Sequence, residues 1–89
     1  MKYPDNEPLL LVEWEDCSAS HGWQSKEQLG DTAMCVSVGF CARDDDTALI
    51  LVESRDLRND ASRPYGCATT IPRSQVRAVY EMKRGKRRV

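Results

Sequence analysis

The chain has 89 residues, of which 40% are hydrophobic and 30% are charged, and its formal net charge at pH 7 is −1. A chain of this length forms one domain with a single small core. No apolar run approaches the roughly 18 residues that a membrane-spanning helix requires, and the start "MKYPDNEP" lacks the apolar segment of a signal peptide, so we expect a cytoplasmic protein.

The first two predicted strands cover residues 9–16 and 33–42, where side chains alternate with a period of two. In the first strand we expect Leu10, Val12 and Trp14 to face the core. In the second strand, large and small side chains alternate, and we assign the large set to the core. That set is Met34, Val36, Val38 and Phe40. The small set is therefore expected on the outer surface; it consists of Cys35, Ser37, Gly39 and Cys41. Residues 17–32 form a long loop with at most one helical turn, at 25–29.

The second half of the chain predicts three further strands. An aspartate-rich turn over residues 43–47 leads to a strand over 48–54 that is apolar on both faces and needs cover on both. A polar loop over 55–66 precedes a strand over 67–71, which ends at Pro72 because proline cannot donate to a ladder. One 3₁₀ turn separates it from the last strand, 76–82. The remaining core residues expected from these strands are Ile50, Val52, Ile71, Val76 and Ala78.

These elements predict an all-β fold, a small five-stranded barrel with a long first loop. The strand order, with Gly66, Pro72 and Val76 before the last strand, resembles the SH3-like and Sm-like small barrels. We divide the chain into an N-terminal extension (1–8), the barrel domain (9–83) and a disordered basic tail (84–89). The residues from Lys83 onward carry five positive charges, so residues 1–82 carry −6, which is −1 minus 5.

The chain also resembles a widespread group of small phage and prophage proteins. The segments that carry this resemblance are "VEWEDCSASHGWQSKEQL", "SVGF", "ALILVES" and "TTIPRSQVRAV". The matching positions are Val12, Trp14, Asp16, Gly22, Trp23, Ser37, Val38, Gly39, Ile71 and Pro72. The resemblance implies a phage accessory protein acting in the host cytoplasm, and it implies no particular activity.

The candidate binding site combines the long first loop with the turn before the last strand, which border one cleft in an SH3-like barrel. It consists of His21, Trp23, Pro72, Arg73 and Gln75. An aromatic ring, a rigid proline and a guanidinium suit a planar or anionic partner. Trp23 has a competing structural interpretation, in which it closes the open end of the barrel over the core.

No nucleophile motif or phosphate loop supports catalysis, and we expect neither an enzyme nor a cofactor. Cys17 and His21 have a spacing that zinc could use, with Cys67 from elsewhere, but no second tight ligand pair accompanies them. The favoured function is a binding protein that occupies a host protein or sequesters a small nucleotide-like signal. The alternative is a nucleic-acid-binding barrel that uses Arg73, Arg77 and the basic tail. The small outer set of the second strand, with Leu49 and Leu51 beside it, predicts a homo-oligomer.

Overall fold

A computed structural model describes residues 7–16, 23–28, 30 and 32–89 of the chain. In this part the chain forms five strands and two short 3₁₀ helices, without an α-helix, which confirms the all-β class. In chain order the elements are β1 (Leu9–Asp16), η1 (Lys26–Gln28), β2 (Ala33–Asp44), β3 (Ala48–Arg55), β4 (Tyr65–Pro72), η2 (Arg73–Gln75) and β5 (Val76–Glu81). The predicted strands therefore lie where expected, with differences only at their ends.

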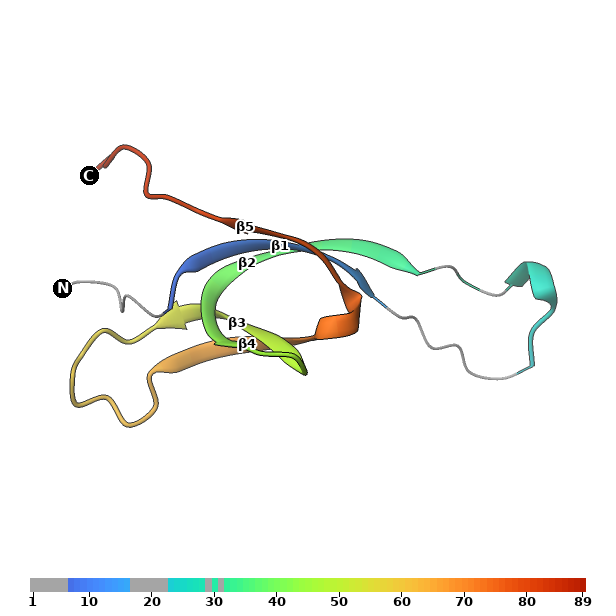
Figure 1. Cartoon of the computed structure of the whole chain (residues 1–89), viewed down its shortest axis with the longest axis horizontal. Coiled ribbons are helices and arrows are strands. Elements are labelled where there is room, and N and C mark those ends of the chain that lie inside the picture. Colours follow the sequence, from blue (N-terminus) through green and yellow to red (C-terminus); the bar gives the residue numbers. More distant parts are fainter. Residues whose placement is uncertain (1–6, 17–22, 29, 31) are drawn as a thin grey trace.

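The strands form one antiparallel sheet in the order β4-β3-β2-β1-β5. The sheet curls into two layers, with β5 and β1 in one layer, β3 and β4 in the other, and β2 curving from the first to the second (Figure 1). A closed barrel needs a ladder between its terminal strands. Here β4 and β5 lie at opposite edges of the sheet, so the described strands do not close into the predicted barrel.

The curl depends on β2, which pairs with β1 along its first part and with β3 along its second. The register of β2 against β3 shifts between Cys41 and Arg43, and such bulges bend a strand. Just before this shift, Gly39 is buried, and a Cβ atom added there would lie 2.8 Å from the carbonyl oxygen of Val52. The two strands approach this closely because residue 39 has no side chain.

The core lies between the two layers. Its buried cluster comprises Leu10, Val12, Cys41, Leu49, Leu51 and Ile71. Trp14 and Val76 are partly buried against this cluster. The indole N–H of Trp14 donates a hydrogen bond of 3.0 Å to Ser37 Oγ, so the polar end of the ring has a partner. The predicted core positions on β1 and those at residues 71 and 76 therefore face or border the core, and Val52 is buried outside this cluster. The predicted core positions at Ile50 and Ala78 are wrong, because Ile50 alternates with the inward-facing Leu49 and Leu51, and Ala78 is paired with Glu13 on the side away from the core.

The predicted orientation of β2 is wrong. Met34, Val36 and Val38 are 64%, 64% and 50% exposed, and they lie outside the core. Directly paired residues in an antiparallel ladder share a face. The inward-facing residues of β1 pair with the small residues of β2, as Leu10 with Gly39, Val12 with Ser37 and Trp14 with Cys35.

The reason for this orientation is the curvature of β2. Its inner side is concave and crowded by the large side chains of β1 and β3, and only small residues fit there. The predicted outer stripe is wrong for the same reason, since Leu49 and Leu51 are 0% and 2% exposed and belong to the core.

The turn between β2 and β3 is held by Asp45, as the aspartate-rich sequence predicted. Its Oδ1 accepts hydrogen bonds of 2.9 Å from the backbone N–H groups of Thr47 and Ala48. Arg43 Nε donates to Asp45 Oδ2 at 2.5 Å. These bonds lower the pKa of Asp45 from 3.8 to about 2, and the hydrogen bond from Arg43 has the largest effect.

The chain after β5 continues without strand or helix, and residues 82–89 are exposed. In Figure 1 this segment runs beyond the end of the sheet. The domain boundaries at residues 8 and 83 and the disorder of the tail stay predictions.

Candidate partner-binding surfaces

The predicted cleft is not assembled by the described residues. The side chain of Trp23 is 104% exposed, so it neither covers the core nor contacts Pro72 or Arg73. It precedes η1, which lies beyond the end of the sheet and away from its two layers (Figure 1). His21 lies outside the described residues. The interpretation of Trp23 as a plug of the barrel is therefore not supported, and its role in binding stays a prediction.

The other three residues of the predicted cleft lie together at the end of β4 and in η2. Pro72 is the last residue of β4, and Gln75 is half-buried. The backbone N–H of Arg73 donates a 3.0 Å hydrogen bond to the carbonyl oxygen of Thr47. Its guanidinium Nη1 lies 2.5 Å from Asp44 Oδ1. Since this carboxylate already pairs with the guanidinium, Arg73 is a weaker anion ligand than the sequence alone indicated.

A second ion pair links the end of β1 to β5. Arg77 Nη2 lies 2.9 Å from Glu15 Oε1, and Thr32 Oγ1 donates to Glu15 Oε2 at 2.5 Å. The hydrogen bonds from Thr32 and then Arg77 hold the pKa of Glu15 below its usual value. Arg77 is displaced from the ladder by a register shift between Glu13 and Trp14, which explains why its side chain reaches Glu15. Like Arg73, it is already paired with an acid.

A buried carboxylate fixes the chain where it enters β1. Glu7 is 7% exposed, and its carboxylate accepts hydrogen bonds from Arg55 Nε at 3.1 Å and from the Tyr65 hydroxyl at 2.9 Å. The Arg55 guanidinium also lies 4.9 Å from the centre of the Tyr65 ring, a cation–π contact. The hydrogen bond to Glu7 raises the pKa of Tyr65. Because the buried carboxylate has both a guanidinium and a hydroxyl as partners, this cluster stabilises the fold.

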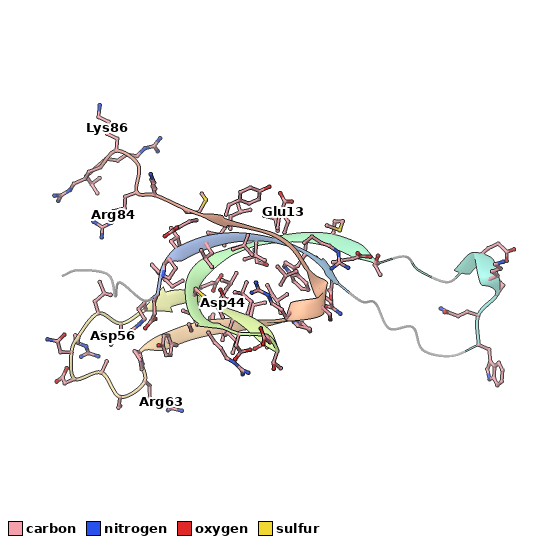
Figure 2. The ribbon with its side chains drawn as sticks, in the orientation of Figure 1. Glu13, Asp44, Asp56, Arg63, Arg84 and Lys86 are labelled. Carbon is pink, nitrogen blue, oxygen red and sulfur yellow. The ribbon has the colours of Figure 1, made fainter. Side chains whose placement is uncertain are left out.

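The convex side of β2, β1 and β5 gathers several exposed apolar side chains of the described residues, and we call it the outer face. Its members are Leu9, Leu11, Glu13, Met34, Val36, Val38, Phe40, Ala78, Tyr80 and Met82, which are exposed or half-buried. Glu13 is a charged member of this face and points away from the core (Figure 2). Glu15, which is paired with Met34, lies on the same side. Sequence reasoning missed this surface because it assigned the large residues of β2 to the core. The outer face becomes apparent once the small residues of β2 are seen to pair with the inward-facing residues of β1.

Among the residues that the structure describes, no group of three or more His, Cys, Asp and Glu side chains could hold a metal ion. The suggested zinc ligands Cys17 and His21 lie outside that part of the chain. Neither of the described helical segments has the length or the apolar character to cross a membrane. Comparison of the chain with family models, curated proteins and solved structures finds no match.

Proposed function

We propose that the protein is a non-enzymatic phage accessory protein that acts on the host by binding a host protein through the loop between β1 and β2. The observation that carries this proposal is the complete exposure of Trp23. An indole in water buries none of its apolar surface, so it contributes nothing to the fold. Tryptophan is one of the residue types enriched among the side chains that dominate protein–protein binding energies. The phage-like sequence pattern, which includes Trp23, supports the same proposal.

The SH3-like assignment of the sheet belongs to this proposal. Its support is the strand order, in which β1 lies between β2 and β5 and the chain continues from β2 through β3 to β4. The 3₁₀ turn between β4 and β5 lies where the resemblance to SH3-like barrels expects one. In such a scaffold the first loop projects from one end, and loops on rigid sheets commonly carry binding residues.

A protein partner is favoured over a small nucleotide-like ligand by the surroundings of Trp23. Small-molecule sites are concave and bury most of the ligand surface. Because Trp23 is fully exposed, no described side chain stands opposite its ring to form a second wall. A single projecting indole instead fits into a pocket on a larger partner.

A nucleic-acid partner is disfavoured by the charges of the described residues. Arg73 and Arg77, which the sequence suggested as phosphate contacts, pair with Asp44 and Glu15. Residues 1–82 carry a net charge of −6, which repels phosphate.

The test is photo-crosslinking in host cells from a probe amino acid placed at Gln24, beside Trp23. The control places the same probe at Val89, which is 100% exposed in the tail. We expect a defined host-protein adduct from position 24 that disappears in Trp23→Ala, while adducts from position 89 are unaffected by that substitution. Adducts that are the same with and without Trp23 would overturn the proposal. Binding of a cyclic dinucleotide to the purified protein with quenching of Trp23 fluorescence, and no host adduct, would overturn it in favour of the small ligand.

Trp23→Ala should fold as well as the wild type, because the side chain buries no surface. The melting temperature of the variant, measured by circular dichroism, therefore separates loss of binding from loss of structure. A plug of the core would cost about 3 kcal/mol or more on truncation, and such a loss would show that the indole is buried in solution.

A further inference from the structure

On the outer face, mostly apolar side chains of three adjacent strands form rows that run across the sheet. Leu11 on β1 is paired with Val38 on β2 and with Tyr80 on β5. One row along, Leu9 is paired with Phe40, and its carbonyl oxygen accepts a 2.8 Å hydrogen bond from the N–H of Met82. One row in the other direction, Glu13 is paired with Val36 and Ala78. Val36, Val38, Tyr80 and Met82 are 64%, 50%, 52% and 40% exposed. This much apolar side-chain surface on one sheet face is typical of a surface that is covered by a partner.

The two ends of this face carry opposite charges. Glu13 lies toward one end, one row from Leu11, and Asp16 ends β1 there, while the charge of Glu15 between them is offset by its ion pair with Arg77. Because β5 runs antiparallel to β1, the chain after Met82 leaves at the other end, and residues 83–88 add five positive charges there. Figure 2 shows Glu13 above the middle of the sheet, and Arg84 and Lys86 beyond the far end of β5.

This polarity makes the face complementary to a copy of itself. Consider a two-fold axis that lies in the plane between the two faces, runs perpendicular to the strands and passes close to Leu11. This axis places the rows of one copy in reverse order over the rows of the other. The Leu11 rows then meet each other, and Glu13 of each copy lies toward residues 83–88 of its partner. A two-fold axis along the strands would instead bring Glu13 against Glu13 and one basic tail against the other.

The size of the face sets the strength of the contact. With strands about 4.8 Å apart and side chains of one face about 6.8 Å apart along a strand, three strands and four rows cover roughly 400 Å². A standard interface buries about 800 Å² on each partner. The four rows from Leu9 to Glu15, of which two carry a glutamate on β1, supply about half of that. The contact is therefore small, the charged groups at its ends contribute to it, and it weakens with salt.

We propose that the outer face of β2, β1 and β5 is an interface between two copies of this chain, packed face to face around a two-fold axis, with Glu13 of each copy against the basic tail of the other. This surface is distinct from Trp23, so the proposal goes beyond the binding function and leaves the indole of each copy free.

The first experiment is sedimentation velocity of the full chain from about 5 to 200 µM, in 50 mM and 500 mM NaCl. We expect a dimer that forms in this range and dissociates more readily at the higher salt. Val38→Lys should raise the dimer dissociation constant at least about tenfold, because it buries a charge at the centre of the contact. The matched control, Asn59→Lys, introduces the same charge on the exposed loop between β3 and β4 and should leave the dissociation constant unchanged. Far-UV circular dichroism confirms that each variant is folded, and Tyr80→Lys replaces Val38→Lys should the latter not fold.

The second experiment tests the two-fold arrangement by charge reversal. Glu13→Lys places a positive charge against the basic tail, and the triple change Lys83→Glu, Arg84→Glu and Lys86→Glu places acids against Glu13. Each variant alone should be monomeric at concentrations where the wild type is dimeric. An equimolar mixture should form a heterodimer, because the Glu13→Lys side chain of one copy then meets the acidic tail of the other, while its own basic tail meets a native Glu13.

A wild type that remains monomeric at 200 µM overturns the proposal. So does a dimer that survives both Val38→Lys and Tyr80→Lys, because the contact must then lie elsewhere, for example at the open edge of β4. A mixture of the charge-reversed variants that stays monomeric overturns the two-fold arrangement. Trp23→Ala should still dimerise, so failure of the host-binding proposal and failure of this one are separate results.

Discussion

Val12 and Val38 lie on adjacent strands, and the same substitution should have very different effects at the two positions. Val12 on β1 is 0% exposed and belongs to the core cluster, whereas Val38 on β2 is 50% exposed on the outer face. We predict that Val12→Asp unfolds the protein and that Val38→Asp leaves it folded.

The magnitudes follow from the burial of the two side chains. Removing a fully buried valine costs about 1.5–3 kcal/mol, and an unpaired carboxylate in its place adds several kcal/mol. A domain of this size has roughly 5–13 kcal/mol of stability in total, so Val12→Asp removes most or all of it. At Val38, half of the side chain is already in water and the new carboxylate stays hydrated. We expect a loss of about 1 kcal/mol or less there, as at other surface positions.

Urea unfolding monitored by far-UV circular dichroism measures both changes. The protein concentration is kept near 2 µM, so that association of the outer face adds little to the apparent stability. Val12→Asp should show no unfolding transition, and Val38→Asp should show a transition close to that of the wild type. If Val38→Asp is unfolded and Val12→Asp is folded, the large residues of β2 face the core and our assignment of its faces is wrong.

Three further predictions concern the bend, the turn and the tail. Gly39→Ala should lower the free energy of unfolding by about 1–3 kcal/mol in urea titrations, because its Cβ would lie 2.8 Å from a backbone oxygen of β3. An unchanged free energy of unfolding would show that β2 and β3 can move apart at this point without cost. Asp45 has a folded-state pKa of about 2, below its usual 3.8. It therefore contributes stability above about pH 4 that is lost as the pH falls through about 2, and Asp45→Asn should reduce the acid sensitivity of the melting temperature in this window. Removing residues 84–89 should leave the melting temperature nearly unchanged at low protein concentration, since they have too little apolar surface to pack; a large decrease would show that the tail docks on the acidic body of its own chain.

The two candidate surfaces differ in how far the sequence predicts them. Trp23 stands out as an aromatic residue in a polar loop, and its complete exposure matches a contact residue better than a plug. The sequence could not reveal that Arg73 is already paired, because Asp44 lies 29 residues earlier in the chain and reaches it only through the sheet. The outer face was missed altogether, because it depends on which side of β2 is concave.

The sequence by itself determined the secondary structure of this protein. Alternation along each strand, the aspartates of the 43–47 turn and the ladder-breaking Pro72 act through neighbouring residues, and the strands begin and end close to where these local signals place them. Only the tertiary structure decided which side of β2 faces the core. Both of its alternating sets are free of charge along residues 34–41, so local hydrophobicity does not distinguish them. The choice comes from the pairing with β1 and from the bend at Gly39, which make the inner side concave and leave room there only for small side chains.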